Sequence, residues 1–205
     1  SGAGETINAT ANWWGEATGP AVDSILGDVI FCGWLDSAYP DGTPVAMPVQ
    51  NTTQGTTYCR IQDAIDAANP DDVIEVAAGT YVEDLVIDKA LTLLGPNAGI
   101  NPNTEARLAE AVILPATSAP DPYGDCSVMT YIETSGVTIK GFTFDGDNPA
   151  ITSGISIGSA DVDACEIIAG WEGMGNTVIE NNILNHATYA GIEFYNYVNT
   201  AATAE

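Results

Sequence analysis

Basic residues are scarce in this chain. Its 205 residues include 4 Lys and Arg against 28 Asp and Glu, which gives a formal net charge of −24. Nucleic acids and anionic membranes are bound by clustered Lys and Arg that neutralise phosphates, so neither partner is expected. The chain also lacks an apolar run long enough to span a membrane, and membrane insertion is not expected. The acidic residues are spread over turns, which predicts a well-solvated surface.

Cysteines in CxxC spacing are also missing. The even number and wide spacing of the four cysteines argue against a zinc site or a thioredoxin-type motif. Of the three pairings that four cysteines allow, we favour Cys32–Cys59, which closes the loop-rich segment 33–57, together with Cys126–Cys165, which braces the long turns of the second half. Four buried free thiols are the alternative. Because disulfides form in oxidising compartments, this pairing predicts an extracellular or cell-surface protein.

The most informative stretch is IQDAIDAANPDDVIEVAAGTYVEDLVIDKALTLLG, residues 61–95. Apolar residues at helical spacing predict a short α-helix over about 61–68, which Pro70 ends. No second helix separates the Val-, Ile- and Leu-rich strands that follow at 73–76, 85–87 and 91–94. Short strands that turn a corner every few residues predict an all-β coil whose turns stack on one another.

The same alternation continues in VTIKGFTFDG from residue 137, NTVIENNILN from residue 176 and GIEFYNY from residue 191. Every second side chain of such a strand points inward. Long turns at 119–125 and 159–174 interrupt the repeat. The residues expected to face the interior are Val137, Ile139, Phe142, Phe144, Ile155, Ile157, Val178, Ile179, Ile183, Ile192 and Phe194.

These phrases resemble the right-handed parallel β-helix of the pectin-lyase-like superfamily and, more narrowly, the repetitive surface and NosD-like proteins of bacteria and archaea. The resemblance covers most of residues 58–197. It implies that the helix caps the N-terminal end of the coil and that the protein is extracellular. The chain then divides into an N-terminal strand segment (1–36), a linker or loop (37–57) and a parallel β-helix domain with long turns (58–205).

The phrase INATANWWGEATGP, residues 7–20, resembles a segment that normally follows the last turns of such a coil, but here it comes first. This order predicts either a piece of a tandem array or a subunit whose N-terminal strands complete the open C-terminal end of a neighbour. An unfinished turn leaves unpaired backbone groups that invite strand addition. We therefore predict a non-enzymatic structural or adhesive surface protein, whose partners are neighbouring modules or copies of itself arranged head to tail. The residues assigned to assembly are Ile7, Ala9, Trp13, Trp14, Ile192, Phe194 and Tyr195.

Aromatic residues leave a second interpretation open. Trp13 and Trp14 offer faces for sugar stacking, although packing over the end of the coil is the alternative that we favour. A carbohydrate-binding groove along the coil would use Tyr189, Tyr195 and Tyr197. Surface glycans are the partner under this interpretation, and a polysaccharide-degrading enzyme is the third class considered.

The catalytic phrases of the enzymes in that superfamily have no counterpart here. The sequence lacks the paired QD and DFIFG-type phrases of pectin esterases and the NTD, DD and GHG series of polygalacturonases. The single histidine, His186, follows a strand in a turn, where a surface or packing role is expected. We do not expect an enzyme. A lyase would need a base among clustered basic residues, and those present are scattered: Arg60, Lys89, Arg107 and Lys140.

Two oxygen-rich turns are candidate metal sites. Asp145, Asp147 and Asn148 offer three oxygen ligands of the kind that calcium prefers, and a solvated loop is the alternative. Asp161 and Asp163 form a weaker second set. No other cofactor is expected. The glycosylation acceptor motif occurs at Asn8 and Asn51.

Overall fold

The computed structural model describes residues 7–16, 29–30, 32–38, 40–119, 127–171 and 173–195, and the account below concerns these residues. They form mostly strands arranged in parallel sheets, with one short helix. The predicted all-β class is therefore confirmed. None of the helical structure described is long and apolar enough to cross a membrane.

The helix α1 (Ile61–Ala67) matches the predicted helix to within one residue. Its apolar residues Ile61, Ala64 and Ile65 are fully buried in the core, as their helical spacing requires. Proline ends the helix, and Asp71 then turns the chain with a positive φ of 69°. The helix is too short to be stable alone, so its stability comes from this buried face.

Three sheets contain most of the strands. The first has the order β16-β11-β8-β5-β3-β4, formed by β16 (Val178–Glu180), β11 (Thr138–Lys140), β8 (Leu91–Leu94), β5 (Asp72–Val76), β3 (Val49–Asn51) and β4 (Thr56–Tyr58). The second has the order β17-β12-β9-β6, formed by β17 (Ile183–Asn185), β12 (Thr143–Asp145), β9 (Ala111–Leu114) and β6 (Gly79–Val82). The third has the order β18-β15-β10-β7, formed by β18 (Ala190–Phe194), β15 (Glu166–Gly170), β10 (Val128–Ile132) and β7 (Leu85–Ile87).

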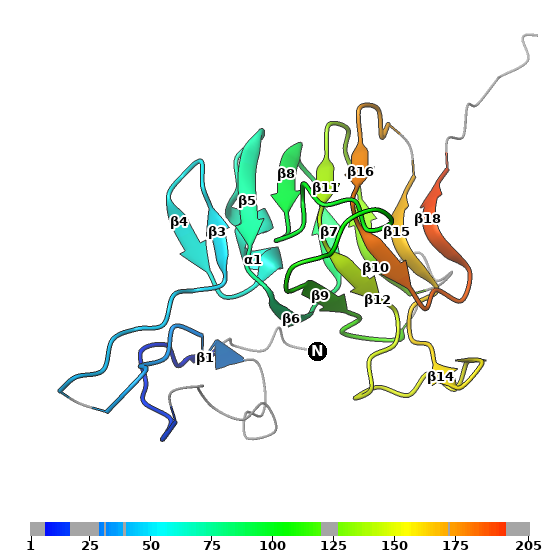
Figure 1. The fold of residues 1–205 in the computed structure, drawn as a ribbon. Helices are drawn as coiled ribbons and strands as arrows, with labels where there is room; N and C mark the ends of the chain where they lie inside the picture. Colours follow the sequence, from blue (N-terminus) through cyan, green and yellow to red (C-terminus); the bar gives the residue numbers. More distant parts are fainter. Residues whose placement is uncertain are drawn as a thin grey trace, which may run out of the picture.

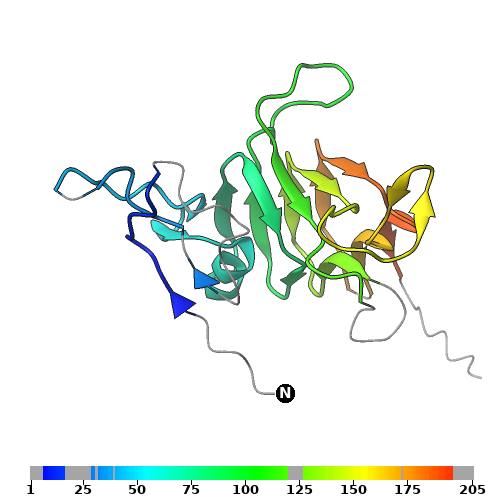
Figure 2. The same ribbon diagram turned by 90° about the horizontal axis from the view of Figure 1, so that it is seen from below.

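The chain visits these sheets in a fixed rotation. From β5 onward, successive strands enter the first, second and third sheet in turn, and each return adds a strand parallel to the previous one. Only β13 (Ser156–Ile157) and β14 (Ala160–Asp161) leave this order, as an antiparallel hairpin. Figure 1 shows the strands advancing from the α1 end of the molecule to the β18 end, and Figure 2 shows the same progression from below.

Residues in register form apolar columns through the core. In the first sheet Ile74 lies beside Leu93, which lies beside Ile139, and all three are fully buried. In the second sheet Phe144 lies between Ile113 and Leu184. Of the predicted inward residues, Val137, Ile139, Phe142 and Phe144 are confirmed. In contrast, Ile155 and Ile157 are 56% and 47% exposed, because they belong to the β13–β14 hairpin outside the three sheets.

The predicted linker 37–57 contains sheet structure. Strand β3 pairs antiparallel with both β4 and β5, so the first sheet begins well before residue 58. The hairpin was missed because its strands are only three residues long and lie in a Pro-, Gly- and Thr-rich stretch. Within the expected N-terminal segment, β1 (Ile7–Asn8) pairs with β2 (Val29–Ile30) in a separate two-stranded sheet.

Side chains from the turns also connect neighbouring strands of the sheets. The Asn182 side chain accepts the N–H of Phe142 at 2.9 Å and donates to the carbonyl of Ile139 at 2.9 Å. Gly141 lies below them with a φ of +82°, and a Cβ there would be 2.1 Å from the backbone nitrogen of Ala98. Only glycine therefore fits at that corner.

Candidate functional site

The two ends of the sheet stack differ in how they are closed. At the α1 end, the Gln62 side chain covers the outer edge of β7. Its Oε1 accepts the N–H of Val86 at 2.9 Å, and its Nε2 donates to the carbonyl of the same residue at 3.1 Å. The Gln62 amide thus makes the hydrogen bonds that a neighbouring strand would make, and it protects an otherwise open strand edge.

Charged side chains from the sheets hold α1 in this position. Its N-cap residue, Arg60, makes no side-chain cap, and the N–H groups of Ile61 and Gln62 donate instead to the Glu83 carboxylate at 3.0 and 2.9 Å. At the other end of the helix, the Lys89 ammonium donates to the carbonyls of Ile65 and Asp66. A carboxylate at the N-terminus and a cation at the C-terminus both match the helix dipole. At this end the helix therefore covers the core and the edge of β7.

The opposite end is open. Strands β16, β17 and β18 are the outermost strands of the three sheets, and among the described residues no strand pairs with their outer edges. Burial falls in this last layer: Ile168 is fully buried, but its register partner Ile192 is 46% exposed. Phe194, in register with the buried Gly170, is 39% exposed. Val178 is in register with Thr138 on the outward side of the first sheet and is 40% exposed, so its predicted inward placement is wrong. Residues that are core in the inner layers thus become surface at this end, which makes it the candidate interaction site.

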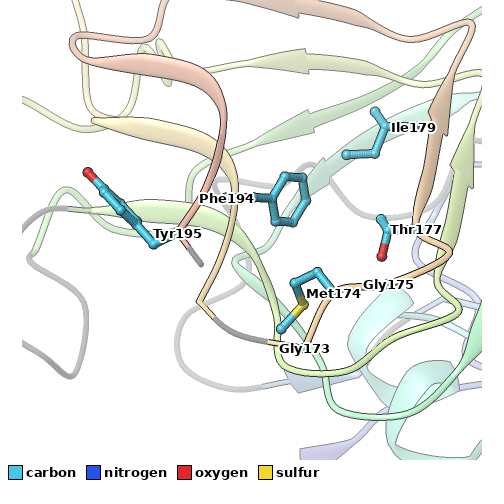
Figure 3. A pocket seen from close by; sticks show the side chains of 7 residues that line it. All are labelled: Gly173, Met174, Gly175, Thr177, Ile179, Phe194 and Tyr195. Atoms are coloured by element: carbon cyan, nitrogen blue, oxygen red, sulfur yellow. The ribbon is translucent and has the colours of Figure 1, made fainter. Parts of the chain in front are cut away.

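A pocket of about 570 Å³ lies in this end. Its walls are mainly apolar, and Figure 3 shows the Phe194 ring and the Ile179 side chain directed toward its interior, whereas the Tyr195 ring points away. The hydroxyl of Thr177 is buried without a hydrogen-bond partner. The complete lining consists of Gly173, Met174, Gly175, Thr177, Ile179, Phe194 and Tyr195.

Aromatic residues also gather on the outer side of the last layer. The rings of Trp171 and Tyr195 stack with centroids 4.6 Å apart and planes 17° apart. A hydrogen bond with Glu193 is the main cause that raises the pKa of Tyr195, followed by one with Tyr189. Tyr189 is 68% exposed, and Tyr197 lies outside the described residues. The structure therefore brings together two of the three tyrosines predicted for a carbohydrate groove.

The N-terminal residues assigned to assembly lie far from this pocket. Figures 1 and 2 place β1 near the α1 end, opposite β18. Ile7 is 55% exposed, Trp13 is 37% exposed, and Ala9 and Trp14 are half-buried. The disulfide Cys32–Cys59, with a Cα–Cα distance of 5.6 Å, links this segment to the start of α1 and confirms the predicted pairing. No described cysteine is a free thiol, and Cys126 lies outside the described residues.

Basic residues make structural contacts. Arg107 forms a two-point ion pair with Glu110, Lys140 pairs with Glu180, and Lys89 caps the helix. The histidine Nδ1 lies 2.5 Å from the Asp145 carboxylate in an exposed turn, and this hydrogen bond raises the pKa of His186. These contacts hold turns and helix ends together.

Two of the three predicted calcium ligands, Asp145 and Asn148, have hydrogen-bond partners within the protein. Asp145 contacts the histidine, whereas the Asn148 side chain accepts the N–H of Ala150 and donates to the carbonyl of Pro115. Asp161 binds the turn at Ser153 and Gly154. Within the described ranges no group of three or more His, Cys, Asp or Glu side chains is arranged to hold a metal ion. The geometry thus favours the structural alternative for these turns.

The two glycosylation motifs differ in accessibility. Asn8 is exposed in β1, and its carboxamide oxygen accepts hydrogen bonds from Thr10. Asn51 is fully buried, and its amide nitrogen donates to the Asp72 carboxylate at 2.8 Å. A glycan at Asn51 does not fit the folded chain, because it would replace this buried hydrogen bond.

No protein-family model, curated protein or solved structure matches the chain.

Asp84, in the turn after β6, provides a test of the electrostatics of the closed end. Burial raises its pKa from 3.8 to about 6, although its carboxylate accepts the N–H of Ala116. The pKa of Asp84 is higher in the folded chain than in the unfolded chain, so the carboxyl loses its proton at a lower pH when the chain is unfolded. The free energy of unfolding therefore falls as pH rises from about 4 to 6. Asp84→Asn is expected to stabilise the protein above pH 6 by about 1 kcal/mol, after allowance for partial exposure, and to have no effect below pH 4. Urea unfolding at pH 4 and pH 7.5 measures both values, and an equal effect at the two pH values would contradict the assignment.

Proposed function

We propose that the three sheets are the faces of a right-handed parallel β-helix and that this β-helix is a non-enzymatic structural module that stacks end to end outside the cell. The rotation of the chain through three parallel sheets supports the β-helix. The right-handed sense follows the strong preference of parallel crossover connections. The disulfide is compatible with an extracellular location.

The single observation that carries this proposal is the contrast between the two ends. The chain closes the α1 end with Gln62, Glu83 and Lys89, yet leaves three strand edges and apolar core residues exposed at the other. An exposed edge of this kind is a template for strand addition from another chain or module. Burying the exposed apolar surface of the last layer supplies the driving force. The open end is thus an association surface.

Self-association provides the test. The wild-type chain is expected to show a sedimentation coefficient that rises with concentration, and electron micrographs are expected to show end-to-end particles. Phe194→Glu places a charge at the mouth of the open end and is expected to keep the chain monomeric. Ile157→Glu is the matched control, because Ile157 is also an exposed apolar residue, at 47%, but lies in the β13–β14 hairpin outside the three sheets. A wild-type chain that stays monomeric at every concentration contradicts the proposal, and so does a Phe194→Glu chain that assembles like the control.

A carbohydrate-binding module is the second candidate, and the stacked Trp171–Tyr195 pair beside exposed Tyr189 favours it. Aromatic faces are suited to sugar rings. Binding of acidic and neutral polysaccharides to Tyr189→Ala and wild-type chains would decide between the two candidates.

A further inference from the structure

We propose that the pocket in the open end receives the Trp13 side chain of a second copy of this chain, so that association is head to tail. This inference rests on the proposed stacking function and names the segment that enters.

The pocket can bury an apolar side chain. The strand edges beside it can pair with the backbone of the segment that carries this side chain. Met174, Ile179 and Phe194 provide an apolar floor and walls, and the outer edges of β16 and β18 are unpaired in the described part of the chain. The buried Thr177 hydroxyl has no hydrogen-bond partner, so an incoming polar atom is expected beside it. The indole of a tryptophan offers a large apolar face and one N–H donor, which matches this lining.

The N-terminal segment offers these features. Residues 7–15 contain no charged side chain, although the whole chain has a net charge of −24. Trp13 and Ile7 are both exposed, so their apolar area is available for burial. The pair β1–β2 is parallel and stands apart from the three main sheets, with Ile7 in register with Val29. A separate parallel pair is suited to extend sheets whose strands are themselves parallel.

Charge argues against a tail-to-tail arrangement, in which the open ends of two copies meet. Each open end contains Glu180 and Glu193, and only Glu180 has a described basic partner, Lys140. A tail-to-tail contact would bring the acidic residues of both copies together, which is unfavourable. A neutral N-terminal segment meets no such repulsion.

Position also favours the head-to-tail contact. Strand β1 and the last-layer strand β18 lie at opposite ends of the molecule, as Figures 1 and 2 show, and the Cys32–Cys59 disulfide links the donor segment to the start of α1. One chain therefore cannot fill its own pocket with this segment without large rearrangement. Contacts between two different surfaces propagate into a filament unless the rotation closes a ring.

Complementation between two blocked chains tests the inference. A Trp13→Ala chain retains an intact pocket, and a Phe194→Glu chain retains an intact N-terminal segment. Each alone is expected to be monomeric, with association weakened at least tenfold relative to the wild type. An equimolar mixture is expected to form a 1:1 dimer and nothing larger, because one donor and one acceptor remain. Ile157→Ala, which removes an exposed apolar side chain from the β13–β14 hairpin outside the three sheets, is the control and is expected to assemble like the wild type.

The outcomes separate the inference from the proposed function. If Trp13→Ala alone assembles as the wild type does while Phe194→Glu does not, the open end associates but Trp13 is not the group that enters, and the inference is overturned. A Trp13→Ala chain that forms only a dimer indicates tail-to-tail contact and overturns it as well. If the wild-type chain does not associate at any concentration, the proposed function itself is contradicted. Circular dichroism melting of each variant verifies that the blocked chains are folded.

Discussion

Replacing Arg107 with Met is expected to lower the free energy of unfolding by about 3 kcal/mol. The guanidinium is well buried, with a side chain only 11% exposed, and forms a two-point ion pair with Glu110 at 2.8 and 2.9 Å. It also donates to the carbonyls of Phe142, between β11 and β12, and Asn181, between β16 and β17, which belong to the next two layers of strands. One side chain thus joins three consecutive layers at the same corner. Its removal takes a donor from these two carbonyls, from the carbonyl of Ile100 and from the Glu110 carboxylate. Phe142 keeps the N–H of Ile183, and Glu110 keeps the amide of Asn97.

Lys140→Met is the matched control for this prediction. Lys140 also pairs with a glutamate, Glu180, but both side chains are more exposed, at 29% and 53%. An exposed pair of this kind contributes about 0.5 kcal/mol or less. Chemical denaturation of both variants at pH 7 measures the difference. Equal losses in the two variants would show that the contacts of Arg107 with the neighbouring layers do not add stability.

The pH dependence of the Arg107 effect has a defined sign. The hydrogen bond from Arg107 is the main cause that lowers the pKa of Glu110. Because the folded pKa is the lower one, the stabilisation is present above the ordinary glutamate pKa of 4.5 and is lost as pH falls through the folded value. The gap between the wild type and Arg107→Met is therefore expected to narrow in acid.

The helix and the strands that follow it were predictable because their side chains repeat at fixed spacing. Ile61, Ala64 and Ile65 mark one face of a helix, and the predicted strands at 85–87 and 91–94 match β7 and β8. Strand β6 was missed, since Gly79 and Thr80 interrupt the apolar pattern. A short strand can form without a strong pattern when neighbours on the stack supply its hydrogen bonds.

The candidate site was predictable only in part. Phe194 and Ile192 were recognised as inward residues of the last strand, but the sequence carries no local signal for Met174 and Thr177, which reach the pocket from a turn. The contacts of Arg107 between layers could not be predicted either, because its partners Phe142 and Asn181 are 35 and 74 residues away in the sequence. Contacts between layers depend on the length of each turn, and a single sequence does not show where the long turns begin and end.

Replacing Glu83 with Ala is expected to cost about 3 kcal/mol of unfolding free energy. Glu83 is only 5% exposed, and its two carboxylate oxygens accept the N–H groups of Ile61 and Gln62. Burial raises the pKa of this carboxyl, and the two N–H donors oppose that rise. Without the carboxylate, two buried N–H groups lose their acceptor, and Gln62 loses the support that positions its amide on Val86.

Glu75→Ala serves as the control, since Glu75 is an exposed glutamate on the neighbouring β5 and its loss is expected to cost less than about 0.5 kcal/mol. Hydrogen exchange locates the damage: the amides of Ile61, Gln62 and Val86 should lose protection first in the Glu83→Ala chain. A loss no larger than that of the control would contradict the capping role. Because Glu83 lies at the closed end, self-association through the open end should persist in this variant below its melting temperature, so that stability and assembly are separated in one chain.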